Sequence, residues 1–360
     1  TFLRGDNSWQ AALPTQTSNA NKVLVTDGSS ASWEYAKPVN MAGAGSTDTL
    51  NDLSTTTIFR KRNKVYNADF HIWQRASTAN LTGSASAYYT ADRWKTAHNV
   101  GAYTQSRQQG AQKYGHNRGL RMACTTAEAA PSATAYCYIK QGFEGWDLQE
   151  MKAGSAPLGG TPQIFVISFW VKSSLTGTYV MQNWCTSSST CCATYTIDVA
   201  NTWEKKVLAF PGNNQGGFAD DNSWNWDIRW WLVAGSNYTS SALQTTWANV
   251  GGTTTGFATG QTNFASSDAN TWDISGIQWE LGDTATAFEG KSIQQDIAEC
   301  QRYYQKSYNM TVDPGTNGAT GASSGLAIYS SGSQGLGARW TQPMRSAPTV
   351  TLYTPGGTSG

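Results

Sequence analysis

The sequence predicts an all-β protein whose main domain is an antiparallel β-sandwich of the jelly-roll type. Charged residues make up only 14% of the 360 residues, while Gly (36), Trp (16) and Tyr (16) are abundant, a balance that favours strands over helices. Short runs of alternating or continuous apolar residues follow one another, separated by turns rich in Gly and Asn. The longest apolar run, residues 164–171, is far too short for a membrane span, so we expect no membrane insertion.

The predicted strands of the main domain fall between residues 65 and 290. Residues 223–233 carry the clearest pattern: Trp and Ile stand at even positions and Asn, Asp and Arg at odd ones. This alternation predicts a strand with one buried face and one solvent-exposed face. We expect five tryptophans in the core: Trp170, Trp224, Trp226, Trp230 and Trp279. The predicted strands are residues 134–140, 163–172, 179–184, 194–199, 204–210, 223–233 and 274–281.

Residues 1–64 differ from this domain because they contain few large apolar residues. Residues 22–25 and 31–35 flank an Asp-Gly turn and predict a β-hairpin. A lone hairpin buries too little apolar surface to be stable. We therefore predict that residues 1–64 form a shaft, trimerisation or anchoring segment that is stabilised by contacts with other copies of the chain or with a partner. The chain begins without Met and ends in a Gly-rich tail, and we expect it to be a piece of a longer protein.

The residues after 290 predict three further parts. Ser292 and Gln295 fit a capping box, and apolar side chains recur at helical spacing behind them, so residues 291–310 are predicted as a docking helix. Its expected buried face consists of Ile293, Ile297, Cys300 and Tyr304. Residues 311–325 are a predicted linker. Strand patterns at 326–329, 338–341 and 348–353 then predict the start of a second, truncated β-domain.

Charge and cysteine usage exclude several classes of protein. The 25 basic and 24 acidic residues are mixed along the chain, which argues against nucleic acid as a partner. The six cysteines form no CxxC pair and the chain has only three histidines, so we expect no zinc, no other cofactor, and reduced thiols made in a cytosol.

Nine short motifs follow one another along the chain, at residues 67–75, 91–94, 141–145, 167–172, 202–206, 277–282, 285–289, 300–304 and 343–349. In this order, over about residues 65–350, they resemble a module of tail-fibre-like proteins of tailed bacteriophages. The resemblance implies a virion protein, commonly a homotrimeric fibre, whose jelly roll is similar to a carbohydrate-binding module; it supplies no catalytic motif and no ligand. Residues 2–10 are similar to a repeated shaft element of such fibres.

Five charged residues lie near the ends of the predicted sandwich. If residues 67–75 form its first strand and 274–281 its last, the two strands can be neighbours. The arginines would then have carboxylate partners, and a paired charge is far less costly to bury than a single one. We expect these residues to lock the sandwich, with a ligand site as the alternative. They are Asp69, Arg75, Asp92, Arg93 and Glu280.

Loops that combine an aromatic ring with polar neighbours are the candidate ligand sites. Sugars offer C–H faces that stack on aromatic rings and hydroxyls that pair with Asn, Asp and Arg. The acidic pair Asp220 and Asp221 could instead hold a structural calcium ion. The candidate ligand-binding residues are Trp146, Phe218, Asp220, Asp221, Asn222 and Tyr238.

The expected function is that of a phage virion fibre protein, on tail or head, with a module that recognises host cell-surface polysaccharide. Expected partners are two further copies in a homotrimer and other virion proteins bound through the N-terminal segment. One alternative is a purely architectural adaptor or head fibre. Another is a glycan depolymerase, which would need two carboxylates across a cleft; because neither a solenoid repeat nor a nucleophile motif is present, we expect no enzyme.

Overall fold

The computed structural model describes residues 62–151, 161–186, 188–250, 256–317 and 340–353, together with four short strands near the N-terminus. The chain divides into two units, Thr1–Lys61 and Arg62–Gly360. In the first unit, β1 (Phe2–Leu3) pairs with β2 (Trp9–Gln10), and β3 (Lys22–Thr26) pairs antiparallel with β4 (Ala31–Tyr35), which is the predicted hairpin.

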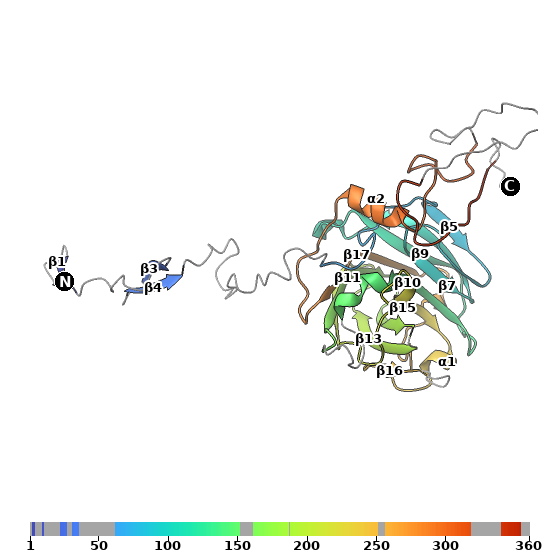
Figure 1. Ribbon diagram of the computed structural model, residues 1–360. Coiled ribbons are helices and arrows are strands. Elements are labelled where there is room, and N and C mark those ends of the chain that lie inside the picture. Colours follow the sequence, from blue (N-terminus) through green and yellow to red (C-terminus); the bar gives the residue numbers. More distant parts are fainter. Residues whose placement is uncertain are drawn as a thin grey trace, which may run out of the picture. The chain divides into compact units, whose positions relative to one another are not determined.

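The second unit is a sandwich of two antiparallel sheets, which confirms the predicted fold class (Figure 1). One sheet has seven strands in the order β16-β13-β12-β15-β10-β7-β6, and the other has six in the order β14-β11-β17-β9-β8-β5. The chain crosses repeatedly from one sheet to the other, as in a jelly roll. The strands are β5 (Thr78–Leu81), β6 (Ala85–Ala87), β7 (Lys95–His98), β8 (Ala102–Gln109), β9 (Arg118–Thr126), β10 (Tyr136–Glu144), β11 (Phe165–Ser173), β12 (Gly177–Cys185), β13 (Ser189–Ile197), β14 (Glu204–Phe210), β15 (Trp224–Ala234), β16 (Ala248–Asn249) and β17 (Thr271–Leu281).

The core between the sheets is built largely from aromatic rings. Trp226 and Trp230 on β15 and Trp279 on β17 are fully buried, and the ring of Phe165 on β11 lies 5.3 Å from that of Trp226. These inward positions alternate along each strand with outward ones, because successive side chains of a strand point to opposite faces. All six cysteines are buried and free.

Two of the tryptophans expected in the core lie elsewhere. Trp224 is 38% exposed at the start of β15, and Trp170 on β11 is half-buried and stacked on Tyr114. Trp170 alternates with the buried Phe169 and Val171, so it faces outward. Trp224 leaves the even-numbered inward series because the pairing of β10 and β15 shifts register at Phe143/Glu144.

The predicted first strand at residues 67–75 is wrong. This segment is a turn in which Asn67 and Phe70 have φ values of 47° and 53°, a left-handed conformation that no strand accommodates. The side chain of Asn67 accepts from Ile72 N and donates to the Ile72 carbonyl, which closes the turn. The segment still lies beside β17, since Ile277 N donates to the Ala68 carbonyl at 3.0 Å.

Helix α2 (Ile293–Gln301) is shorter than predicted and shows only half of the capping box. Ser292 Oγ accepts from Gln295 N, but the Gln295 side chain donates to Glu299 instead of returning to the cap. Of the predicted buried face, Cys300 is 1% exposed whereas Ile293 is 48% exposed. Shorter helices are η1 (Gln112–Tyr114), η2 (Gly145–Asp147), η3 (Gln149–Met151), α1 (Ser236–Thr239) and η4 (Phe264–Ser266). None of the helices in the described parts is long and apolar enough to span a membrane.

Residues 340–353 form no strand apart from a single bridge residue at Tyr353, contrary to the strand predicted at 348–353. Of the strand predicted at 338–341, only residues 340 and 341 are among the described residues, and neither is in a strand. Pro343 and Pro348 lack the N–H that a sheet ladder needs. The segment contacts the sandwich through Arg345, whose N donates to the Arg302 carbonyl at 2.9 Å. The strand predicted at 326–329 lies outside the described residues.

Candidate functional site

The outer face of the seven-stranded sheet carries a row of polar and aromatic side chains. On β15, the alternation that buries Trp226 and Trp230 turns Asp227 and Arg229 outward. Asp227 lies opposite Gly142 of β10 on one side and opposite Trp184 of β12 on the other. Three adjacent central strands therefore contribute to one surface.

Asp227 is the electrostatic centre of this row. Its side chain is only 2% exposed and accepts hydrogen bonds from Lys140 Nζ at 2.6 Å, from the Arg229 guanidinium at 2.9 Å and from Trp224 Nε1 at 2.6 Å. A buried carboxylate is stable only when it is paired in this way. Burial lowers the pKa of Lys140 from its usual value, although Asp227 acts in the opposite direction. The Arg229 guanidinium also lies 4.9 Å from the centre of the Trp184 ring.

The indole of Trp224 lies across Gly142, and this contact needs a glycine. A Cβ atom at Gly142 would stand 2.8 Å from Trp224 Cδ1 and 3.0 Å from an Asp227 oxygen. Trp224 therefore lies on one side of Asp227 and the half-buried Trp184 on the other. We call this set of residues, Lys140, Trp184, Trp224, Asp227 and Arg229, the β15 platform.

Sequence reasoning missed the platform although part of its pattern was visible. The alternation in residues 223–233 predicts the solvent-exposed positions of β15, but it places Trp224 in the core with its even-numbered neighbours. The partners Lys140 and Trp184 lie on other strands, and only the register of pairing brings them to Asp227.

Three of the predicted ligand residues gather beside the platform. Trp146 in η2 is 56% exposed, and its N donates to the Asp221 carbonyl at 3.0 Å, which joins the loop after β10 to the loop before β15. The Asp221 carboxylate accepts from Ser223 N and Oγ, which lowers its pKa. The side chain of Asn222 donates to the Arg345 carbonyl of the C-terminal segment, so it is already engaged.

The other predicted ligand residues have different surroundings. Phe218 packs inward, with its ring 5.4 Å from that of the core residue Trp226. Tyr238, from α1, lies 5.1 Å from the ring of Trp231 at the far end of β15, where burial raises its pKa. Asp220 is exposed. In the described part of the chain, no group of three or more His, Cys, Asp or Glu side chains is placed to hold a metal, and the calcium proposal has no such ligand set.

The five charged residues expected to lock the sandwich fall into separate contacts. Arg75 pairs with Asp92 at 2.6 Å, as anticipated. Asp69 instead contacts the His116 ring at 2.7 Å, and Arg93 donates to the Gly142 carbonyl. Glu280 accepts from Thr286 and lies 3.8 Å from Arg62.

The sequence also missed a bidentate ion pair between β10 and the residue after α2. Arg302 donates to both carboxylate oxygens of Glu144, at 2.8 and 2.7 Å, and the Tyr303 hydroxyl donates to the same carboxylate. The partners are 158 residues apart, so no local pattern could indicate the pair.

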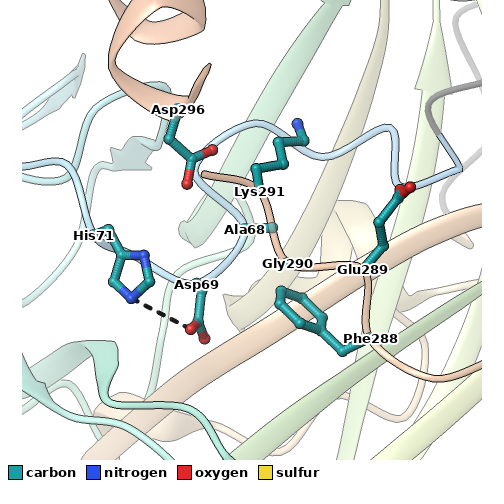
Figure 2. A pocket seen from close by; sticks show the side chains of 8 residues that line it. All are labelled: Ala68, Asp69, His71, Phe288, Glu289, Gly290, Lys291 and Asp296. Atoms are coloured by element: carbon teal, nitrogen blue, oxygen red, sulfur yellow. Dashed lines mark ion pairs between the residues drawn. The ribbon is translucent and has the colours of Figure 1, made fainter. Parts of the chain in front are cut away.

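One small pocket lies between the turn at residues 68–71 and the chain leading into α2 (Figure 2). Asp69 and His71 line one side, with an ion pair of 3.4 Å between them, and Phe288 and Lys291 line the other. Its volume of about 30 Å³ accommodates about one water molecule. The pocket therefore cannot receive a sugar ring.

Comparison with known proteins gave only distant structural likenesses. No protein-family model matches the chain, and the search of curated proteins found no match. A solved structure of the enzymatically active domain of tailspike protein 4 from bacteriophage CBA120 is 11% identical with a TM-score of 0.28, covering 61% of this chain and 21% of that one. A putative sugar binding protein from Bacteroides thetaiotaomicron is 14% identical with a TM-score of 0.32, covering 61% and 100%.

A third structure, TmCBM61 in complex with β-1,4-galactotriose, is 7% identical with a TM-score of 0.29, covering 62% of this chain and 100% of that one. This chain thus spans about a fifth of the tailspike structure. Similarity at this level does not indicate what the chain binds.

Proposed function

We propose that the sandwich is a glycan-binding module and that the β15 platform is its binding face. The observation that carries this proposal is the pair of indoles, Trp224 and Trp184, on either side of a carboxylate held by two cations. An indole ring stacks on the C–H face of a sugar, while charged groups beside it exchange hydrogen bonds with the hydroxyls. Because Asp227 fixes Trp224, Lys140 and Arg229, these groups are held in place before the ligand arrives.

We further propose that the module acts by binding and not by catalysis. Glycoside hydrolysis needs a carboxylic acid of raised pKa facing a second carboxylate across a cleft. Glu144, Asp227 and Asp273 are each paired with a cation within 3.0 Å, so these three carboxylates are already engaged in ion pairs between elements of the fold. Burial raises the pKa of Asp92 to about 6, but its side chain is only 1% exposed and pairs with Arg75.

The biological setting that we propose is the virion of a tailed bacteriophage, with the chain as part of a homotrimeric fibre anchored through residues 1–61. The ordered succession of fibre-like motifs from residue 67 to residue 349 supports this setting. Light scattering of the full chain tests the trimer, and mass spectrometry of purified virions tests the location. A monodisperse monomer would contradict the homotrimer.

The glycan proposal is tested by binding of the full chain to bacterial cells and to a glycan array. Trp224→Ala and Trp184→Ala are each expected to weaken binding about fivefold or more, since one stacked aromatic ring contributes about 1 kcal/mol or more. Trp340→Ala is the matched control, because Trp340 is similarly exposed (44%) but lies in the C-terminal segment.

Two results would overturn the assignment. If the folded Trp224→Ala and Trp184→Ala variants bind as tightly as the wild type, the ligand binds elsewhere. If a correctly folded wild-type protein binds no glycan, the purely architectural role in the virion becomes the better explanation.

A further inference from the structure

The outer face of the other, six-stranded sheet carries a second cluster of aromatic and basic side chains. On β11, Trp170 and Lys172 alternate with the buried Phe169 and Val171, and they therefore face outward, away from the core. This cluster lies on the opposite sheet from the β15 platform, and none of its residues belongs to that platform.

The aromatic part of the cluster is a stacked pair. The ring of Tyr114, from η1 in the β8–β9 connection, lies on Trp170 with 3.8 Å between ring centres and 16° between planes. Tyr114 is 44% exposed and has no part in the core, so the stack leaves a large aromatic surface facing solvent. Gly110 allows this connection to fold tightly against its neighbours, because a Cβ there would stand 2.2 Å from the Arg118 carbonyl.

The charged part of the cluster has more cations than carboxylates. Asp273, 1% exposed, accepts a bidentate bond from Arg121 at 2.7 and 2.8 Å and pairs with Lys172 at 3.0 Å. Both of its oxygens are thus occupied. Two further lysines remain exposed beside the stack: Lys113 Nζ lies 5.6 Å from the Tyr114 ring centre, and Lys205 is the strand partner of Trp170.

We propose that this face is a second saccharide site, specific for acidic sugars that carry carboxylate or sulfate groups. One sugar ring stacks on the exposed Tyr114–Trp170 pair, and its anionic substituent pairs with Lys113 and Lys205. A neutral sugar would leave the surplus positive charge without a counterpart, whereas an anionic one complements it. The inference does not depend on the β15 platform, because the two sites lie on different sheets and have separate ligand groups.

Retardation of the full chain in native gels tests this site. The gels contain alginate (carboxylate), dextran sulfate (sulfate) or neutral dextran. We expect alginate or dextran sulfate to retard the wild type and neutral dextran to have no effect, and the response of the two anionic gels distinguishes the preferred acid. Tyr114→Ala and the double variant Lys113→Ala/Lys205→Ala are each expected to weaken the affinity at least tenfold. Raising the salt to 0.5 M is expected to weaken it as well, since exposed charges are screened.

Two control variants separate the second site from general attraction to polyanions and to exposed indoles. Trp340→Ala removes an exposed indole from the C-terminal segment, and Lys95→Ala removes a lysine from β7 of the opposite sheet; neither is expected to change the retardation. The inference is overturned if no acidic polymer retards the wild type, if Lys95→Ala weakens binding as much as the Lys113/Lys205 double variant, or if Tyr114→Ala folds with an unchanged melting temperature and binds normally.

Discussion

Replacing Asp227 by Asn tests the reasoning behind the β15 platform. The substitution keeps the size of the side chain and removes its charge. Asp227 is 2% exposed and accepts from Lys140, Arg229 and Trp224, so the variant leaves two cations facing a neutral amide. We expect the sandwich to lose stability, because a buried or half-buried cation without its carboxylate keeps its desolvation cost.

The expected magnitude follows from how exposed the two cations are. Breaking a fully buried ion pair costs about 3–5 kcal/mol. The side chains of Lys140 and Arg229 are 18% and 13% exposed, so water partly solvates them after the change, and the lower end applies. We therefore expect Asp227→Asn to reduce the free energy of unfolding by about 3 kcal/mol, which lowers the melting temperature by about 6–12 °C in a domain of this size.

Urea unfolding followed by tryptophan fluorescence measures this effect at neutral pH. Asp221→Asn is the matched control: its carboxylate is exposed and its contacts are local, so the variant is expected to unfold at the same urea concentration as the wild type. A loss below about 1 kcal/mol for Asp227→Asn would refute the view that this carboxylate holds the platform together.

Three further predictions concern other parts of the sandwich. Gly276→Ala is expected to cost at least about 2 kcal/mol in urea unfolding, because the new Cβ would stand 2.4 Å from the His116 ring at a φ of +54°; Gly83→Ala, with φ +72° and open space, is expected to cost only about 1 kcal/mol. Burial raises the pKa of Asp92 from 3.8 to about 6, which means that the folded state favours the protonated carboxyl. The contribution of Asp92 to the free energy of unfolding is therefore full below pH 4 and falls by about 3 kcal/mol as the pH rises to 6. Asp92→Asn is expected to abolish this pH dependence of the free energy of unfolding, measured from pH 4 to 7. Burial alone would raise the pKa of Glu144, but its hydrogen bonds to the residues after α2 lower the pKa below 4.5. Its contribution to stability is therefore present at neutral pH and is lost as the pH falls through the lowered pKa. Glu144→Gln is expected to destabilise the protein at pH 7 and to have a progressively smaller effect as the pH falls below 4.5.

Local composition and periodicity were sufficient to predict the sandwich and seven of its strands, β10–β15 and β17, but not β5–β9 or β16. The alternation in residues 223–233 places Trp226 and Trp230 inward because a strand repeats every two residues, whatever lies beside it. The hairpin in residues 22–35 and the cap at Ser292 follow from local chemistry in the same way: an Asp-Gly turn and a hydroxyl that accepts from a helix amide.

Contacts between segments far apart in the sequence determined the structural features that local patterns do not predict. The turn at residues 67–72 replaces the predicted first strand because the Asn67 side chain bonds to the backbone of Ile72, and its place beside β17 depends on contacts with residues more than 200 positions away. A register shift between β10 and β15 turned Trp224 outward onto Gly142.

Neither of the two proposed sites could be predicted from the sequence, and the physical reason is the same for both. Each consists of a carboxylate, Asp227 or Asp273, held by a lysine and an arginine, with aromatic rings alongside. The members of each site come from separate strands and loops, and sequence spacing carries no information about which strands lie side by side. The sequence by itself determined that aromatic and charged side chains would alternate along β-strands; the tertiary structure decided which of them meet, because only the sheet order and register set the distances between them.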